Sequence, residues 1–316
     1  MRVAFQGEIG AYSEEAVLAL FPDAEVVPKA SFEAVFEAVD RREVDAAVVP
    51  IENSLHGSVH ANYDLLREHS LSITAELQLR IRHHLMGTED LPLSEVRAVH
   101  SHPQALGQCR DFLRGRLPQA DVVPAYDTAG AAKLVAERAD PTQVAIASQS
   151  AAREYGLVTL AAGIESNPNN FTRFLALAGA ASGVGAAAGS GAEAADPGAG
   201  AAPRPSGAAA PGPAAADPGP AAASGSGPFK TSLLYVPGHN IPGVLFKSLA
   251  VFALREIDLF KIESRPLVGS PGKYIFYLDL AGSVEDETVL KAIDHLREIA
   301  AFVKVLGSYR IGRMLG

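Results

Sequence analysis

A hydroxyl and a guanidinium group stand side by side where a polar loop meets an apolar strand. The segment is NPNNFTRFLAL, residues 167–177, and the pair is Thr172 and Arg173. A buried guanidinium requires an anionic partner, because an unpaired charge in a protein interior is costly. A carboxylate ligand would satisfy it through two parallel hydrogen bonds, and an internal Asp or Glu side chain would also satisfy it. The first alternative predicts a binding site for an organic acid beside the hydroxyl of Thr172.

Two other polar clusters stand at points where strands should end. FQGEIGAYSEEA contains Gly7 and Gly10 in a strand-to-helix turn, which either offers free backbone amides to an anion or is a structural turn only. VVPIENSLHGSVH places Asn53 after a buried strand, so that its side chain either projects toward a ligand or caps a helix. Neither cluster by itself decides between these alternatives.

A further cluster, VHSHPQALGQC, combines a helix start with a row of amides. Pro103 favours the first turn of a helix, where its missing N–H is not needed. Ser101 therefore lies just before the N-terminus of that helix. Gln104 and Gln108 are one turn apart and share a face, which is unusual for a purely solvated surface. Cys109 lies among the apolar positions, and we interpret it as an inert core residue rather than a nucleophile.

These clusters belong to a region in which strands and helices alternate. Residues 2–5, 24–28, 45–50, 73–81, 120–127 and 143–148 have the apolar runs of strands, and helical patterns begin at residues 13, 31, 128 and 148. Strands separated by short helices predict βαβ units with mostly parallel sheets. Two such sets predict an α/β fold of two lobes, with a cleft at the carboxyl ends of the strands.

A change of composition ends this region. Residues 179–228 are Ala, Gly, Pro and Ser, except for the charged residues Glu193, Asp196, Arg204 and Asp217 and the aliphatic residue Val184. Such a segment cannot bury enough surface to offset the backbone entropy of ordering, about 1–2 kcal/mol per residue. We expect a flexible linker.

The order of elements changes after the linker. Strands are expected at 230–238, 258–266, 273–280 and 302–310, with helices at 242–256 and 285–300. This βαββαβ order predicts a ferredoxin-like domain. Each helix has one apolar stripe, so the helices would cover one face of the sheet. The other face would be bare in a monomer, which predicts association with a second copy.

The composition and net charge argue against several classes of protein. The 316 residues carry a net charge of −9 without a cluster of Lys and Arg, which argues against a nucleic-acid partner. A single cysteine excludes an intrachain disulfide and a Cys-based zinc site. The first residues, MRVAFQGEIG, lack the apolar core of a signal peptide, and no apolar run is long enough to span a membrane. We therefore expect a cytoplasmic protein that does not associate with membranes.

Taken together, GEIGAYSEEA, VPIENSLHGSV, SHPQALGQC and NFTRF resemble, in this order, the motifs of prephenate dehydratase. The segments IPGVL and KIESRP resemble the ACT regulatory domain that follows the catalytic region in that family. The resemblance covers the chain except the linker. It implies a two-lobed catalytic region resembling periplasmic binding proteins at 1–178, a linker at 179–228 and an ACT domain at 229–316.

The resemblance implies conversion of prephenate to phenylpyruvate, with loss of water and carbon dioxide, on the route to phenylalanine. Thr172 matches the catalytic hydroxyl of the family, and the reaction requires no metal or organic cofactor. Asn53, Ser101 and Gln108 match positions that line the site and would act as neutral hydrogen-bond donors. We assign Arg173 the role of anchoring a substrate carboxylate, which is an inference of our own.

The resemblance also implies feedback regulation by L-phenylalanine and a homodimer or homotetramer. The effector-binding positions would be Asn240, Pro242, Gly243, Val244, Leu245, Glu263, Ser264 and Arg265. Val244 replaces the alanine usual in the family, so the sign and strength of regulation stay open. Two other functions are open as well. One is an arogenate dehydratase on the same scaffold, and the other is a non-catalytic, two-lobed binding protein with a sensor domain.

Overall fold

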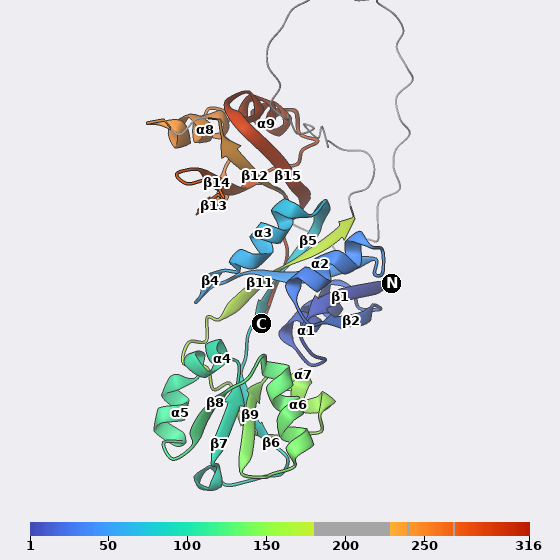
Figure 1. The fold of residues 1–316 in the computed structure, drawn as a ribbon, viewed down its shortest axis with the longest axis vertical. Coiled ribbons are helices and arrows are strands. Elements are labelled where there is room, and N and C mark those ends of the chain that lie inside the picture. Colours follow the sequence, from blue (N-terminus) through green and yellow to red (C-terminus); the bar gives the residue numbers. More distant parts are fainter. Residues whose placement is uncertain (180–227, 239–240, 268) are drawn as a thin grey trace, which may run out of the picture.

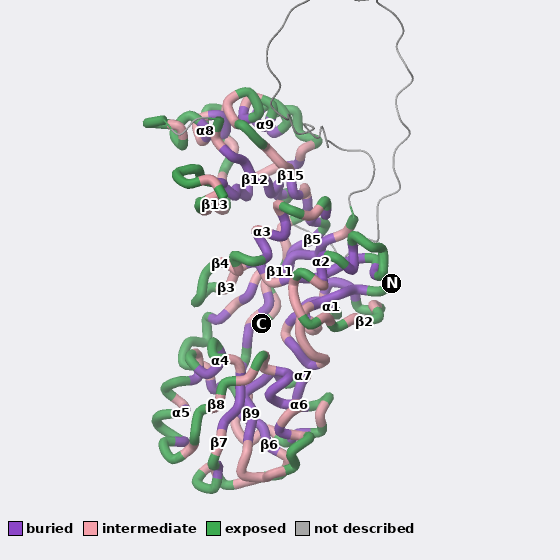
Figure 2. The backbone as a smooth tube through the Cα atoms, in the orientation of Figure 1, coloured by how far each residue is buried: buried purple, intermediate pink, exposed green. Residues whose placement is uncertain are grey.

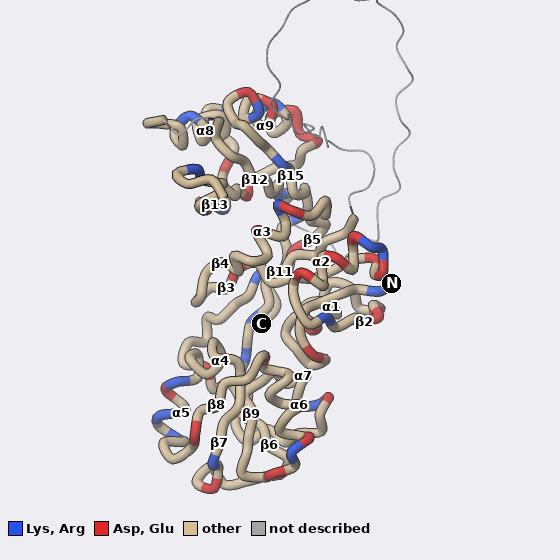
Figure 3. Tube along the Cα trace, in the orientation of Figure 1, with Lys and Arg blue, Asp and Glu red and all other residues tan. Residues whose placement is uncertain are grey.

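The computed structural model describes residues 1–179, 228–238, 241–267 and 269–316. They form three parts that follow one another along the long axis of the molecule (Figure 1). The linker expected at 179–228 lies almost wholly outside the described residues. Acidic and basic positions are interspersed over all three parts (Figure 3). In the part of the chain that is described, none of the helices is both long enough and apolar enough to span a membrane.

The first lobe is built on a seven-stranded sheet with the order β16-β5-β11-β3-β1-β2, and β4 pairs with β3. Its elements are β1 (Arg2–Gln6), α1 (Tyr12–Leu20), β2 (Glu25–Lys29), α2 (Phe32–Asp40), β3 (Ala46–Asn53), β4 (Gly57–Ser58), α3 (His60–Glu68), β5 (Leu71–Arg80), β11 (Phe171–Gly179) and β16 (Met314–Leu315). Apolar residues of α1 pack on one face of the sheet, and those of α2 and α3 pack on the other.

The expectation of mostly parallel sheets was wrong for this lobe, and it also fails in the second lobe, where two of the four strand pairings are antiparallel. β1 runs parallel to β2 and β3, but β11 runs antiparallel to both β3 and β5. The reason is the path of the chain, which returns from the second lobe directly into β11 without a helical crossover. Antiparallel neighbours do not need such a crossover.

The second lobe contains a five-stranded sheet with the order β10-β6-β9-β7-β8. Its elements are β6 (His84–Gly87), the short helix η1 (Leu93–Glu95), β7 (Ala98–Ser101), α4 (Pro103–Gln108), α5 (Arg110–Arg116), β8 (Asp121–Pro124), α6 (Thr128–Arg138), β9 (Gln143–Ala147), α7 (Gln149–Glu154) and β10 (Val158–Ala162). Cys109 is fully buried in its core, and burial raises the pKa of the thiol. The interpretation of Cys109 as an inert core residue is therefore confirmed.

The third part has the ferredoxin-like order predicted from the sequence. β12 (Phe229–Pro237), α8 (Val244–Ala253), β13 (Leu259–Pro266), β14 (Tyr274–Ala281), α9 (Glu287–Ile299) and β15 (Ala300–Arg310) form an antiparallel sheet, β13-β14-β12-β15. The apolar stripes of α8 and α9 pack on one face of this sheet.

The other face of the sheet is not bare, so that expectation was wrong. Leu234, Tyr277 and Tyr309 of this face share one apolar core with Tyr63 and Ile73 of the first lobe. Most positions of β12 are buried, whereas most positions of β15 are intermediate or exposed (Figure 2). The strands alternate between two apolar faces, and the first lobe covers the face that the helices do not.

The C-terminal residues also join the first lobe, which the sequence pattern did not predict. β16 adds to the edge of the seven-stranded sheet in parallel with β5, and Leu315 packs against the core beneath it. The sheet of the first lobe therefore includes a strand that follows the ferredoxin-like domain in the chain.

Candidate active site

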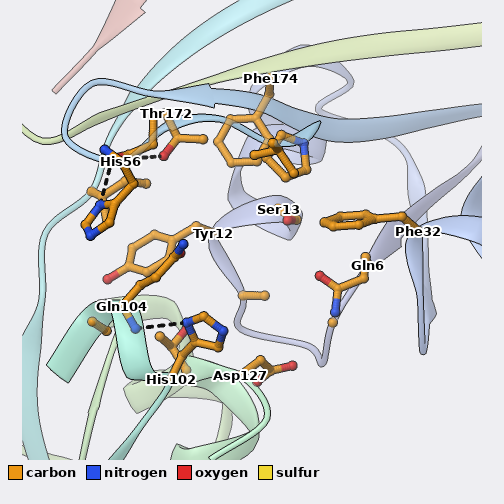
Figure 4. Close-up of a pocket in the computed structure, with 18 of the residues that line it drawn as sticks. Gln6, Tyr12, Ser13, Phe32, His56, His102, Gln104, Asp127, Thr172 and Phe174 are labelled. Atoms are coloured by element: carbon orange, nitrogen blue, oxygen red, sulfur yellow. Dashed lines mark hydrogen bonds between the residues drawn. The ribbon is translucent and has the colours of Figure 1, made fainter. Parts of the chain in front are cut away.

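A cavity of about 590 Å³ lies between the two lobes, which is within the usual range for small-molecule sites. The lining side chains include Gln6, Tyr12, Phe32, Asn53, His56, Thr172 and Phe174 from the first lobe, and His102, Gln104, Gln108, Tyr126 and Asp127 from the second. Figure 4 shows Thr172 and His56 on one side of this cavity, and His102 and Asp127 on another. The cleft predicted from the two sets of strands is present.

Thr172 is held by a neighbouring amide. It stands opposite Asn53 in the β11–β3 register, and Asn53 Nδ2 donates to Thr172 Oγ1 at 3.0 Å. The orientation of this amide is fixed, because its Oδ1 accepts the backbone N–H groups of Leu55 and His56, each at 3.0 Å. The hydroxyl of Thr172 accepts one hydrogen bond from Asn53, so its own proton is available for donation into the cavity.

A β-bulge in β3 places Asn53 on the same face of the sheet as Pro50, toward the cavity and opposite Thr172. Arg173 and Phe174 are consecutive, but they oppose Glu52 and Pro50, so Ile51 is an extra residue in β3. A bulge of this kind re-aims the side chains that follow it.

We predict that Asn53→Asp lowers kcat by about 100-fold, because a carboxylate would accept the proton of Thr172 instead of donating to its oxygen. Asn167→Asp is a matched control, since Asn167 Oδ1 only accepts a backbone N–H in the exposed loop. Steady-state turnover checks both variants. Equal kcat values for Asn53→Asp and the control would contradict the role assigned to Asn53.

Gln108 belongs to a hydrogen-bonded chain that joins the lobes. Gln108 Oε1 lies 2.6 Å from His83 Nε2, and Gln108 Nε2 lies 3.1 Å from His56 Nδ1. At the far end, the hydroxyl of Tyr12 lies 2.9 Å from His83 Nδ1. Burial lowers the pKa of His83, so the ring is neutral near pH 7. A neutral ring that donates from Nε2 to Gln108 leaves Nδ1 as an acceptor. The single proton of Tyr12 lies within reach of this Nδ1 and of the carbonyl of Arg82, at 2.7 Å.

Sequence reasoning missed Tyr12, His56 and His83. A signal existed for His83, which closely follows the strand expected at 73–81, just as the other polar clusters follow strands. His56 lies within the motif that singled out Asn53.

Ser101 does not line the cavity in this structure, and its contact with the substrate stays a prediction. Ser101 is fully buried, is not among the residues that line the cavity, and donates to the carbonyl of Ile146 at 2.6 Å. The next residue, His102, lines the cavity instead. Burial lowers the pKa of His102. Because Ile146 belongs to β9, the hydrogen bond from Ser101 to its carbonyl links β7 to β9.

For Arg173, the alternative of an internal salt bridge is the one that the structure shows. Side chains alternate along a strand, so Arg173 points away from the cavity that Thr172 faces. Its Nε donates to Glu76 at 2.7 Å, its Nη1 to Asp279 at 2.6 Å and its Nη2 to Tyr309 at 3.0 Å. Two carboxylates and a phenol of the protein hold the guanidinium on this side of the sheet, so Arg173 does not line the cavity.

Two of the predicted effector-binding residues have partners in the first lobe. Glu263 accepts from Ser58 and pairs with Lys261 and His60, while Arg265 donates to Asp64 at 3.2 Å. Of the other positions, Pro242, Gly243 and Leu245 are exposed near the start of α8, Val244 is half-buried there, and Ser264 is exposed on β13. Gly243 has φ +80°, which favours glycine, and Asn240 lies outside the described residues. Effector binding stays a prediction.

Gly130 lies in the first turn of α6, against the ring of Tyr126. A Cβ at this position would lie 2.2 Å from that ring, so a side chain there would have to displace the exposed Tyr126. The cavity has an acidic residue nearby in Asp127, which caps α6 through Oδ1. Its Oδ2 is buried and has no hydrogen-bond partner among the described residues.

Comparisons with known proteins agree with these observations. A model of the family described as prephenate dehydratase matches residues 3–182. Arogenate dehydratase/prephenate dehydratase 2, chloroplastic, of Arabidopsis thaliana is 41% identical over 98% of this chain and 73% of its own length.

Two solved structures are similar over nearly the whole chain, at 30% identity each. Prephenate dehydratase from Arthrobacter aurescens in complex with L-Phe has a TM-score of 0.78, with 99% of this chain and 90% of that chain covered. GqqA, described as a novel type of quorum quenching acylase, has a TM-score of 0.76, with 99% and 98% covered. The expected fold class is confirmed. The chain belongs to the prephenate dehydratase family.

Proposed function

We propose that the chain catalyses the decarboxylating dehydration of prephenate to phenylpyruvate in phenylalanine biosynthesis. The observation that carries the proposal is the hydroxyl of Thr172, which lines the interlobe cavity and is oriented by Asn53. Residues 1–178 would form the catalytic unit and residues 229–316 the ACT domain. The cytoplasmic location expected from the sequence stays a prediction, since the Arabidopsis relative is named chloroplastic.

The reaction breaks two bonds of the substrate ring. The electron pair of the bond to the ring carboxylate moves into the ring as carbon dioxide leaves, and the C–O bond of the ring hydroxyl breaks at the opposite carbon. The departing hydroxide takes up one proton and becomes water, and the ring becomes aromatic. Thr172 would donate a hydrogen bond to this leaving oxygen, since its proton is not used by Asn53.

The polar groups near Thr172 suit this reaction because several of them are uncharged. Gln104 and Gln108 are amides, and the lowered pKa values of His83 and His102 favour neutral rings. A cation on the ring carboxylate would stabilise it and oppose its loss as carbon dioxide. Arg173 is the nearest guanidinium along the chain, and it points toward the ACT domain.

A direct assay tests the proposal. The purified chain is incubated with prephenate, and the absorbance of phenylpyruvate is followed with time. We expect turnover that saturates with prephenate. If neither prephenate nor arogenate is consumed, the alternative of a non-catalytic binding protein replaces this proposal.

The name of GqqA suggests a different reaction, but the contacts of Thr172 do not favour it. A hydroxyl nucleophile needs a general base within hydrogen-bond reach. The side-chain partner of Thr172 is the Nδ2 group of Asn53, which donates and cannot accept a proton.

A second candidate substrate is arogenate, which carries an ammonium group where prephenate carries a keto group. Asp127 favours this candidate, because its buried Oδ2 has no hydrogen-bond partner in the described part of the chain and the residue lines the cavity. Burial raises the pKa of Asp127, and an ammonium partner would offset that cost. The names of the plant relatives also include arogenate dehydratase.

Asp127→Asn tests this role, since asparagine can still cap α6. Losing a charged hydrogen bond should reduce kcat/KM for arogenate by about 10- to 100-fold. The value for prephenate should stay within about threefold, because prephenate has no ammonium group to lose. Asp121→Asn, at an exposed position of β8, is the control. An unchanged ratio of kcat/KM for the two substrates would remove Asp127 from substrate recognition.

We infer that L-phenylalanine is the effector and that the ACT domain associates with a second copy. The solved relative in complex with L-Phe supports the first inference. For the second, several large apolar side chains of this domain are exposed, namely Phe246, Leu254, Phe260 and Ile262.

We predict that phenylalanine binds the full chain with saturable heat in calorimetry. Sedimentation at micromolar concentration should show at least a dimer. Phe246→Glu should shift it toward the monomer, because Phe246 is 76% exposed and a charge opposes apolar burial. A monomer with no heat of binding would contradict both inferences.

A further inference from the structure

The ACT domain touches the two strands that carry Asn53 and Thr172, one residue along from each. Arg173 and Glu52 form the neighbouring pair in the β11–β3 register. Arg173 Nη1 donates to Asp279 of β14, and Glu52 pairs with Lys261 of β13 at 3.0 Å. The pair at 53 and 172 therefore faces the cavity, while the pair at 52 and 173 is bound to the ACT sheet.

The contact at Arg173 is a buried ionic cluster that spans the two domains. Glu76 and Asp279 supply two negative charges, and Arg173 and Lys230 supply two positive charges. Lys230 Nζ lies 2.8 Å from Glu76 Oε1, and Glu76, Lys230 and Asp279 are 3%, 6% and 6% exposed. Opposite charges are balanced, which is the condition under which buried ions are tolerated.

Neutral hydrogen bonds complete the cluster. Ser232 Oγ donates to Asp279 Oδ1, and it lies 2.6 Å from the hydroxyl of Tyr309, which accepts from Arg173. The backbone N–H of Gly312 donates to Glu76 at 3.1 Å. Burial alone would lower the pKa of Arg173, but Tyr309 and the carboxylates of Asp279 and Glu76 raise it well above its usual range. Arg173 is therefore held at a fixed place by the ACT sheet.

We propose that Asp279 of the ACT domain is a positioning residue for the active site, which fixes the hydroxyl of Thr172 by anchoring the adjacent Arg173. Consecutive Cα atoms are about 3.8 Å apart, so a shift of Arg173 moves Thr172 with it. A displacement of about 1 Å at a reacting group can cost about 100-fold in rate. The ACT domain is then part of the support of the catalytic hydroxyl, besides any role in binding an effector.

The proposal rests on the proposed dehydratase function, and one assay separates the two. Turnover of prephenate and arogenate is measured for the parent chain and for Asp279→Asn, Asp279→Glu and Asp64→Asn. Asp279→Asn removes a charge at constant shape. Asp64→Asn is the matched control, because Asp64 also pairs across the domains, with Arg265, but does not contact Arg173.

For Asp279→Asn, kcat should fall at least 10-fold while KM stays within threefold of the parent value. Asp279→Glu should recover part of kcat, and Asp64→Asn should stay within twofold. If Asp279→Asn does not fold, Ser232→Ala, which removes one hydrogen bond to Asp279, should lower kcat in the same direction with unchanged KM.

Two results would overturn the proposal while the parent is active. One is a kcat within twofold of the parent for folded Asp279→Asn, or for Ser232→Ala in its place. The other is an equal loss in the Asp64→Asn control. An inactive parent chain would instead overturn the proposed function.

Discussion

Replacing Thr172 by valine is expected to lower kcat by about 100- to 10,000-fold, the range that positioned proton donors contribute. Valine has nearly the same shape but lacks the hydroxyl that faces the cavity. Asn53 would lose one acceptor but would still donate to Asn170 at 2.8 Å and to the carbonyl of Phe171 at 3.2 Å. The loss should therefore report the missing hydroxyl rather than a disturbed loop.

Thr172→Ser is the matched control, because it keeps the hydroxyl and removes a methyl group. We expect kcat within about tenfold of the parent chain, because the general-acid contribution is retained. Steady-state kinetics with prephenate and with arogenate measure both variants. Near-parental turnover by Thr172→Val would show that another group assists the leaving hydroxyl.

Glu76→Gln is expected to have the largest effect on stability. Glu76 accepts from Arg173, from Lys230 and from the backbone of Gly312, and it is 3% exposed. Glutamine would leave the two cations with one carboxylate, and its own NH2 group would face further donors. Breaking a buried ion pair by removing one partner costs about 3–5 kcal/mol.

Unfolding in urea, followed by circular dichroism, measures this effect as a lower midpoint. Glu287→Gln is the control, because Glu287 pairs with Lys291 on an exposed face of α9 and should leave the midpoint unchanged. Equal midpoints for Glu76→Gln and the control would show that the interdomain cluster contributes little to stability.

Local patterns predicted many of the elements, because helical spacing and strand alternation follow from residues close in sequence. They did not predict α3, β6, β10 or β16. The strand of Thr172, the helix opened by Pro103 and the βαββαβ order were all visible in this way. The roles of Arg173 and Ser101 were not. The direction of a side chain depends on the register of its strand, and local spacing does not determine that register.

Contacts between distant segments were also not predictable from spacing. Glu76, Lys230 and Asp279 lie far apart in the chain, and none of them belongs to a recognisable motif. The pairing of β16 with β5 and the covered face of the ACT sheet depend likewise on docking between domains. The polar cluster around Asn53 was only partly predictable, because Asn53 is the last residue of β3 but Thr172 is the second residue of β11.

The most direct measurement is a crystal structure of Thr172→Val soaked with prephenate and, separately, with arogenate. We expect the ring to occupy the interlobe cavity, with its hydroxyl toward residue 172 and its carboxylates away from Arg173. For arogenate, the ammonium group should lie toward Asp127. A ligand bound outside the cavity, or one whose carboxylate pairs with Arg173, would contradict the role proposed for Thr172.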